Sequence, residues 1–300
     1  SVFSGLYQGL GFTLKIRAFR LHLGMYLGGY ISQDIFNAAF TYFAAFVLGG
    51  LFAYSASESL SLTSYMAAGI FTVQTLAVAA VFAAVAFLPK FFPAHTYRYA
   101  VVAYIIGIVG LASFYMLTPE SRSTQILWLV IALVFAGIGR GILNYIPWNT
   151  YNYMADVDQI VTGQRREGSF AGVMTFIRKA AQASAVFCVG AALEFGGLAE
   201  GTKVQSAETM ESIILIMTIG PILVLILGYW VSTKFHLNTD THTVLMNEIA
   251  RFKAGKRTPS SPENEAIIED LTGWKYDQLW GTGINKKSSP SPSIAEPTVD

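Results

Sequence analysis

The chain has 300 residues, of which 53% are hydrophobic and only 13% are charged, whereas about a quarter of residues are charged in ordinary soluble domains. Its mean hydropathy is +0.47 and its formal net charge is +1, a balance that does not point to nucleic acid or to an acidic substrate as a partner. Its single cysteine, Cys188, excludes a disulfide or a thiolate metal cluster within these residues, and we interpret it as a small helix-packing side chain. The composition predicts an integral membrane protein.

Six apolar stretches are long enough to cross a hydrocarbon core of about 30 Å as helices. They lie at residues 21–53, 65–88, 98–117, 125–149, 168–195 and 212–233. Lysine and arginine gather in alternate connections, so the positive-inside rule predicts a multi-pass protein of the cell (inner or plasma) membrane with both termini cytoplasmic. We therefore expect a six-helix transmembrane bundle at 21–234, preceded by a cytoplasmic linker at 1–20.

The first span carries polar side chains along one side of its helix. In the run YLGGYISQDIFNAAFTYF, Tyr26, Tyr30, Asp34, Asn37 and Thr41 recur at steps of three or four residues. A carboxylate near the middle of a bilayer is costly and normally faces a cavity or a cationic partner. We expect Tyr30, Asp34 and Asn37 to bind substrate. The alternative for Asp34 is a buried ion pair that only holds helices together.

The fourth span carries a second polar stripe, formed by Arg140, Asn144, Trp148 and Tyr151. Pro147 should kink or loosen the turn before it, and three glycines between 137 and 141 permit close helix approach, a combination common in transporters. Asn144 and Trp148 are therefore candidate substrate-binding residues. The position of Trp148 is equally typical of an aromatic belt residue at the membrane boundary.

The fifth span contains two adjacent cations, Arg178 and Lys179, roughly a dozen residues from its start. Thr175, Lys179 and Gln182 fall on one stripe, so we expect these three side chains to bind substrate and Lys179 to point inward, with Asp34 on another polar stripe. Arg178 lies about 100° around the helix and either snorkels toward the headgroups or pairs with another helix. A charged cavity of the size of a sugar is the expected result.

The connection DVDQIVTGQRREG joins the fourth and fifth spans and holds acidic and basic residues at the cytoplasmic mouth. We assign Asp156, Arg165 and Arg166 to a cytoplasmic gate and expect Asp156 to pair with Arg165 in one of two access states, since a differential contact biases such an equilibrium. A static loop contact is the alternative. Gly168 and Gly172 then give the fifth span a small-xxx-small face.

The composition becomes polar after the sixth span. We predict a cytoplasmic tail at 235–281 with a short amphipathic helix around Val244–Phe252, resting on the membrane or on the protein. A Ser/Pro-rich segment at 282–300 should be disordered. Lys253, Lys256 and Arg257 are interpreted as a solvated basic face.

Three separated segments carry a resemblance to a known family. The run MADVDQIVTGQRREGSFAGVMTFIRKAAQA, residues 154–183, resembles the segment between the tenth and eleventh helices of the glycoside-pentoside-hexuronide:cation symporters, the melibiose-carrier family within the major facilitator superfamily. KIRAFRLHLGMYLGGY resembles the start of that family's seventh helix, and EDLTGWKYDQLWG resembles its common tail. The matching positions of the first run are Asp156, Gly163, Arg165, Glu167, Gly168 and Lys179. The resemblance covers most of residues 10–281 and implies an all-α membrane fold of six helices equivalent to the C-terminal half of a major facilitator superfamily transporter.

The resemblance also implies a function, namely symport of a sugar or glycoside with Na⁺ or H⁺ as two six-helix halves rock around a central site. The N-terminal half would belong to the same polypeptide or to a separate chain. In the family, the counterpart of Lys179 lies near the sugar and cation sites, Thr175 lines the same helix, and a tryptophan at about the position of Trp148 borders the cavity. Because the family's main cation site lies in its first six helices, we expect no metal site or cofactor in this chain beyond a contribution to binding the coupling cation.

Other functions stay open at this point. A lysolipid or other amphiphile carrier of the same fold predicts a lateral, apolar opening instead of a closed polar cavity. A structural six-helix membrane subunit would not explain three polar stripes. An enzyme is not expected, since the sequence shows no His-rich cluster, Ser/His/Asp arrangement or phosphate-binding loop, and its four histidines lie near or outside the membrane boundaries.

Overall fold

The computed structural model describes residues 11–52, 55–87, 90–199 and 205–281, and these residues form helices and no strand. Six helical segments among them are long and apolar enough to cross a membrane, in the predicted number and order. They are α2 (Arg17–Tyr42) continued through a π-helical stretch (Phe43–Leu48) and α3 (Gly49–Leu51), then α4 (Ala56–Phe87), α5 (Pro93–Leu117), α6 (Arg122–Thr162), α7 (Glu167–Phe195) and α8 (Ala207–Ser232). The prediction of an all-α membrane protein with six spans is confirmed.

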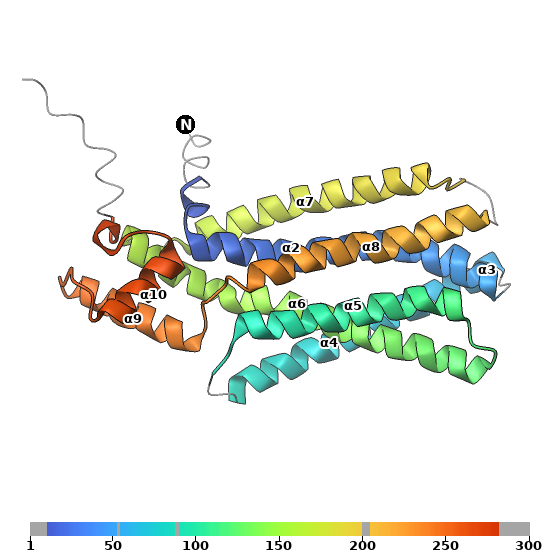
Figure 1. Cartoon of the computed structure of the whole chain (residues 1–300), viewed down its shortest axis with the longest axis horizontal. Helices are drawn as coiled ribbons and strands as arrows, with labels where there is room; N and C mark the ends of the chain where they lie inside the picture. The colour runs from blue at the N-terminus through green and yellow to red at the C-terminus, as the bar shows by residue number, and fades with distance from the viewer. Residues whose placement is uncertain (1–10, 53–54, 88–89, 200–204, 282–300) are drawn as a thin grey trace, which may run out of the picture.

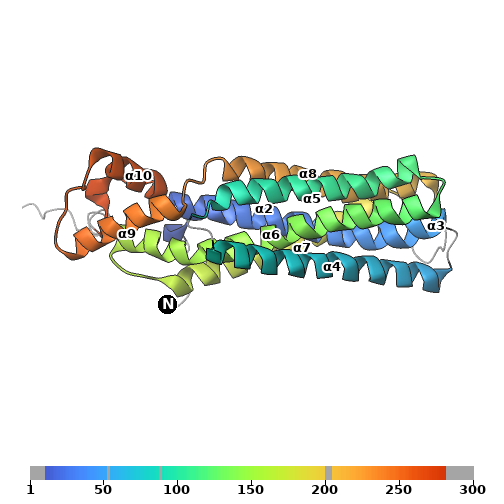
Figure 2. The same cartoon turned by 90° about the horizontal axis from the view of Figure 1, so that it is seen from below.

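The six long helices run side by side along the length of the molecule, with α2 near the centre (Figures 1 and 2). Helix α2 packs against α6, α7 and α8, whereas α4 and α5 both pack along α6. The predicted disordered segment at 282–300 and the first ten residues of the linker lie outside the described residues.

Helix α6 continues past its predicted end at residue 149 to Thr162 and runs through Pro147 without a break. A proline lacks the amide that the carbonyl one turn earlier would accept from, so a kink is its usual effect. The buried His22 of α2 lies with Nε2 2.8 Å from the carbonyl oxygen of Pro147 itself. This bond joins α2 to α6 at the level of the proline.

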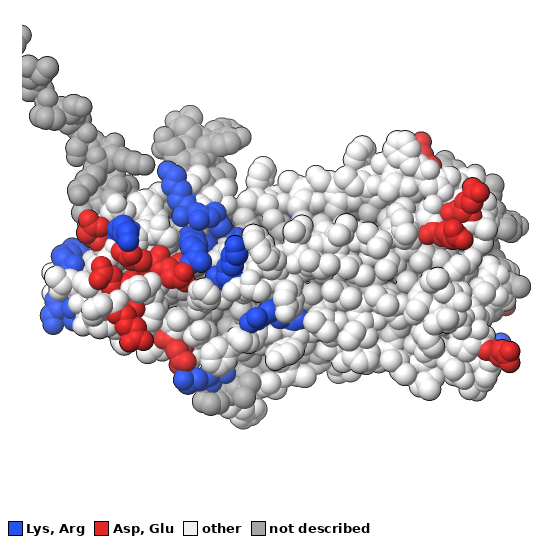
Figure 3. Space-filling model, viewed as in Figure 1, with Lys and Arg blue, Asp and Glu red and all other residues white. Residues whose placement is uncertain are grey.

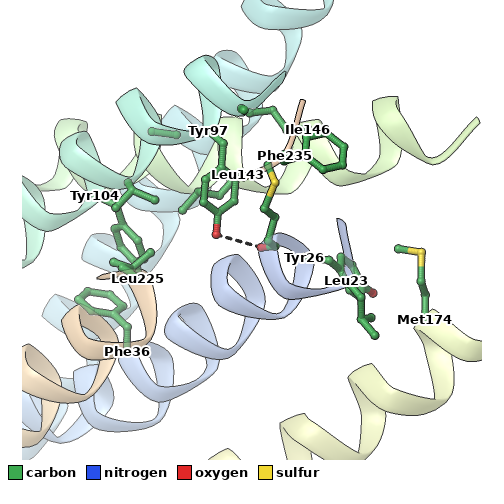
Figure 4. Close-up of a cluster of buried hydrophobic side chains, with 14 of the residues drawn as sticks. Leu23, Tyr26, Phe36, Tyr97, Tyr104, Leu143, Ile146, Met174, Leu225 and Phe235 are labelled. Carbon is green, nitrogen blue, oxygen red and sulfur yellow. Dashed lines mark hydrogen bonds between the residues drawn. The ribbon is translucent and has the colours of Figure 1, made fainter. Parts of the chain in front are cut away.

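Close helix contacts form where glycine or a small side chain removes bulk. A Cβ atom added to Gly28 of α2 would lie 2.9 Å from the Cα of Gly228 in α8, so neither backbone leaves room for a larger residue. The hydroxyl of Tyr97, from α5, enters the same contact and donates to the carbonyl of Met25 at 2.9 Å, a hydrogen bond drawn in Figure 4. The buried rings of Tyr104 and Phe36 pack nearby and fill the space between α2 and α5.

The glycines of α6 confirm the prediction of close approach. Gly137 and Gly141 face α4, whereas Gly139 faces α5, and an added Cβ on any of them would come within 2.6 Å of a neighbouring helix. Gly168 and Gly172 of α7 behave differently, because an added Cβ on either would meet nothing within 4 Å. The small face of α7 is therefore not packed against the described part of this chain.

Beyond the last span, the chain folds into a cap on one end of the bundle (Figure 2). The cap consists of α9 (Thr239–Lys253), α10 (Pro262–Thr272) and a 3-10 turn (Tyr276–Gln278). The predicted amphipathic helix is present in α9 but is longer than expected, and its apolar face rests on the protein, where Ile249 and Phe252 are buried. The amide of Trp280 donates to the carbonyl of Ile160 at the end of α6 at 2.8 Å, and Arg17 of α2 pairs with Asp270 of α10. The cap is thus tied to the ends of α2 and α6.

Candidate functional site

An ion pair between α2 and α7 lies at the centre of the candidate site. Asp34 and Arg178 approach through two contacts, Nη1 to Oδ2 at 2.7 Å and Nη2 to Oδ1 at 2.9 Å. The side chains are only 9% and 13% exposed, respectively, so both charges are largely removed from solvent and neutralise each other. The cation that pairs with Asp34 is therefore Arg178, which confirms the alternative that Arg178 pairs with another helix, whereas its neighbour Lys179 lies about 100° away around the helix and is exposed on this chain.

Aromatic side chains of α2 and α6 adjoin this ion pair. The guanidinium carbon of Arg178 lies 4.9 Å from the ring centroid of Tyr30, and the indole N–H of Trp148 donates to the Tyr30 hydroxyl at 3.0 Å. Tyr26 packs edge-on against Trp148, with ring centroids 6.0 Å apart. Trp148 is still 49% exposed, so one surface of the indole remains free to contact a ligand.

A second group of polar contacts extends the site across α2, α4 and α6. Arg140 donates from Nη1 to Asn37 Oδ1 at 2.7 Å and from Nε to Gln74 Oε1 at 3.1 Å. The side-chain amide of Gln33 donates to Asn144 Oδ1 at 3.0 Å. Because Asn37 stays exposed on the surface of the bundle, these donors and acceptors reach an open face within the membrane-spanning region.

The structure thus brings together five of the eight predicted substrate-binding residues: Tyr30, Asp34, Asn37, Asn144 and Trp148. The other three, Thr175, Lys179 and Gln182, follow a separate line along α7. Thr175 and Lys179 are exposed and Gln182 is half-buried, and none of these side chains has a polar contact in the described part of the chain. The three side chains of the α7 stripe thus lie on the surface of this chain, and they make no polar contact with the described cluster on α2 and α6.

The predicted gate residues lie at the cap end of α6 and form three arginine–carboxylate ion pairs, one of them between Arg165 and Glu167. Arg165 Nη1 lies 3.0 Å from Asp156 Oδ1, and Arg166 Nη2 lies 2.5 Å from the buried Asp158. The second oxygen of Asp156 contacts Nε2 of His242, in α9, at 2.8 Å. The predicted contact between Asp156 and Arg165 is present, and the cap shares the same carboxylate.

Some members of these clusters were not predicted. No pattern in the sequence marks Gln33 or Gln74 as a site residue, because a single amide side chain within an apolar run is as typical of a packing position as of a binding site. His242 lay in the tail, 86 positions from its partner Asp156, and no periodicity links them. The role of Arg140 follows only from the structure. Residues 11–52, 55–87, 90–199 and 205–281 contain no cluster of three or more His, Cys, Asp or Glu that could hold a metal ion.

Comparison with known proteins points to the same class of membrane protein. Residues 4–239 match the model of a family described as MFS/sugar transport protein. The chain is also 26% identical over 195 residues to a protein of Synechocystis sp. described as an uncharacterized symporter. That match covers 64% of this chain and only 32% of the relative, so the chain spans about a third of the length of the protein that it resembles. The family match covers well over half of the chain and agrees with its six spans, and the chain therefore belongs to the MFS/sugar transport protein family.

Proposed function

We propose that this chain forms one half of a symporter that moves a sugar or glycoside together with Na⁺ or H⁺ by alternating access. The observation that carries the proposal is the polar network of Asp34, Arg178, Asn37 and Arg140 with Trp148 beside it, contributed by helices that are otherwise apolar. Polar and charged groups at this depth are costly unless they serve a cavity or partner, so their concentration on one face supports a ligand site.

The chemistry of this face suits a hydroxyl-rich ligand. The Asn37 amide and the Arg140 guanidinium supply donors and an acceptor for hydroxyl groups, while the half-exposed indole of Trp148 offers a flat surface for the apolar face of a pyranose ring. Asp34 already has a cationic partner in Arg178, which leaves it poorly placed to hold a coupling cation by itself. We therefore propose that the principal cation site lies in another part of the transporter.

The exposed stripe of α7 supports the existence of a second half. Lys179 lies twelve positions after Glu167, the first residue of α7, or about 18 Å along the helix, where contact with lipid tails would be unfavourable. Together with Thr175 and Gln182 it would face the water-filled pathway once a second six-helix half packs against this side. The unpacked glycines Gly168 and Gly172 would allow that half to approach closely.

The gate proposal rests on the shared carboxylate of Asp156. Its partner Arg165 lies in the connection between α6 and α7 and also pairs with Glu167, the first residue of α7, so movement of α7 relative to α6 would change the distance between Asp156 and Arg165. We propose that the pair forms in one access state and separates in the other. Asp156→Asn and Arg165→Gln should then lower transport by similar factors, and the double variant should be no worse than either; additive losses would contradict the pairing.

The orientation proposal rests on the distribution of charge. Lysine and arginine side chains gather near the cap, whereas the opposite end of the bundle shows mainly acidic side chains on the face in Figure 3. By the positive-inside rule, the cap end and both termini face the cytoplasm of a cell membrane. In a Cys188→Ala background, a cysteine at Thr162 should react with an impermeant thiol reagent only after the membrane is opened, whereas one at Ser123 should react in intact cells. The reverse pattern would invert the topology.

Transport itself is tested with the full protein that contains this chain, in inside-out and right-side-out membrane vesicles. Radiolabelled sugars and glycosides are supplied under an imposed Na⁺ gradient, an imposed H⁺ gradient or neither. We expect accumulation of at least one sugar with one of the gradients and its loss when an ionophore collapses that gradient. Uptake that equilibrates without regard to either gradient would refute symport while leaving facilitated sugar transport possible.

An amphiphile carrier is a second candidate, favoured by one observation. An open groove of about 610 Å³ lies between α2, α7 and α8, and it is lined almost entirely by apolar side chains, including Ile35, Val189 and Leu215. A lysolipid would place its chain in such a groove and its headgroup near the polar face. The two candidates are separated by measuring sugar uptake in the presence of added lysolipid. A glycoside transporter should retain sugar uptake at lysolipid concentrations that block an amphiphile carrier.

A further inference from the structure

Arg98 of α5 has an unusual environment among the arginines of the described part of the chain. Five other partly buried arginines each contact a carboxylate or amide side chain, and they are Arg17, Arg140, Arg166, Arg178 and Arg251. Arg98 is also partly buried, but its one hydrogen bond within the described residues runs from Nε to the carbonyl of Ala94, one turn earlier, at 3.2 Å. Since a guanidinium carries five N–H donors, both terminal nitrogens of Arg98 remain free for an acceptor.

The Arg98 side chain lines a pocket of about 460 Å³. The pocket lies between the first turn of α5, the end of α8 and the segment that leads into α9. Its polar lining side chains are His95, Arg98, Ser232, Thr233, His236, Asn238 and Thr241, and none of the residues that line it is Asp or Glu. The hydroxyls of Ser232, Thr233 and Thr241 already donate to backbone carbonyls, so the donors available to a ligand come chiefly from Arg98, whose charge favours an anionic ligand.

Two further features of the pocket favour an anion. The first turn of α5, from Pro93 to His95, forms part of the wall, and the amides of a first helical turn have no acceptor within the helix. Two acidic residues adjoin the lining, and each already has a cationic partner. Asp270 lies 2.8 Å from Nδ1 of His236 and is paired with Arg17, and Asp240, which precedes Thr241, is paired with Lys90. These pairings offset both negative charges.

The pocket lies at the level of a membrane boundary. It adjoins the first residue of the α5 span, Pro93, and the last residue of the α8 span, Ser232. Large aromatic side chains remain exposed on the same two helices, with Trp230 57% and Tyr99 75% exposed. The ammonium group of Lys234 lies 4.0 Å from the Trp230 ring centroid, and Figure 3 shows a small basic patch over the ends of α5 and α8. Cations beside exposed aromatic rings are typical of the headgroup region.

We propose that this pocket binds the phosphate group of an anionic phospholipid, with Arg98 as its principal cation and Lys234 at its mouth. The apolar and aromatic surface of α5 and α8 next to the pocket accommodates the acyl chains, which favours a lipid phosphate over a free one. The pocket is lined by residues other than those of the polar face on α2, α6 and α7. A test of lipid binding is therefore independent of a test of sugar transport.

The test measures lipid binding by native mass spectrometry of the full protein in a neutral detergent, titrated with phosphatidylglycerol or with phosphatidylcholine. We expect preferential binding of phosphatidylglycerol to the wild type and about tenfold weaker binding to Arg98→Gln, since a charge-assisted hydrogen bond is lost. Arg98→Lys keeps a cation and should lose less. Lys234→Gln should weaken binding by about fivefold, as expected for one basic group near the membrane surface.

The matched control is Arg122→Gln, because Arg122 is an exposed arginine at the other end of the bundle and lines none of this pocket. It should leave phosphatidylglycerol binding unchanged. Equal losses in Arg98→Gln and Arg122→Gln would overturn the proposal in favour of nonspecific attraction. Displacement of the bound lipid by millimolar inorganic phosphate, with the same dependence on Arg98, would show a site for free phosphate and would also overturn it.

Discussion

Breaking the ion pair between Asp34 and Arg178 should destabilise the bundle far more than removing the neighbouring charge of Lys179. Arg178→Met leaves the Asp34 carboxylate without its partner in a setting where the side chains are only 9% and 13% exposed. Removal of one member of a buried pair typically costs about 3–5 kcal/mol, mainly because the other charge stays buried and unpaired. Lys179 is exposed and has no ion pair in the described residues, so Lys179→Met should cost about 0.5 kcal/mol or less.

Replacing both members of the pair provides the decisive comparison. Asp34→Leu combined with Arg178→Met removes both charges and fills their volume with apolar atoms, so its stability should return to within about 1–2 kcal/mol of the wild type. The remaining deficit reflects the contact of Arg178 with the Tyr30 ring, at 4.9 Å from the centroid, a type of contact worth about 0.5–2 kcal/mol.

The assay is the apparent melting midpoint of the purified full protein in detergent, with membrane abundance as a second readout. For a helical bundle of this size, about 3–5 kcal/mol corresponds to a fall of about 6–20 °C in the single variant. A midpoint for Arg178→Met equal to that of Lys179→Met would refute the assignment of Arg178 as the inward cation. A double variant as unstable as the single ones would refute the electrostatic explanation.

Three further predictions concern packing, ligand contact and pH. Gly28→Ala should destabilise the protein by about 1–3 kcal/mol through overpacking against α8, while Gly50→Ala, where an added Cβ meets nothing within 4 Å, should be neutral or stabilising; equal melting midpoints would contradict the close contact. Trp148→Phe removes part of the half-exposed indole surface and should weaken sugar binding about fivefold, as measured by the concentration dependence of uptake, while the loss of its hydrogen bond to Tyr30 should lower the melting midpoint only slightly; unchanged affinity would remove Trp148 from the site. Hydrogen bonds from Lys275 and from the amide of Tyr276 hold the pKa of Glu269, in the cap, below its ordinary 4.5. Because this pKa is lowered, the ionised Glu269 stabilises the folded state above pH 4.5, and this stabilisation is lost as the pH falls through the pKa of the folded state. Hydrogen-exchange protection of the Tyr276 amide should therefore drop in acid in the wild type and not in Glu269→Gln.

The architecture of the bundle could be predicted from the sequence because length and hydropathy alone specify membrane-spanning helices. The stripe of Tyr30, Asp34 and Asn37 was also predictable, since a helical period of 3.6 residues places these side chains on one face. The same reasoning did not identify Arg178 as the partner of Asp34. Two adjacent cations differ by about 100° in direction, and the choice between them depends on which face of α7 packs against α2, which periodicity within α7 does not encode.

The cap and the gate show a second limit of the sequence. Asp156 and Arg165 lie close together in the chain, so their contact could be inferred from a single loop. The contact of Asp156 with His242 depends on the docking of α9 against α6, which results from tertiary packing of apolar residues such as Ile249. Amphipathic patterning identified the apolar face of α9, but it did not distinguish a protein surface from a membrane surface.

The central claim is that the open face of α2, α6 and α7 lines a water-filled transport pathway, and cysteine accessibility tests it most directly. Asn37→Cys and Val109→Cys are introduced separately into the full protein with Cys188→Ala, since both positions are exposed on the surface of this chain but on different helices. The account predicts that a small hydrophilic thiol reagent modifies Asn37→Cys, that transported sugar slows this reaction, and that Val109→Cys, facing lipid, stays unmodified. Equal and negligible modification of both positions would show that Asn37 faces lipid or a dry interface, and would contradict the claim.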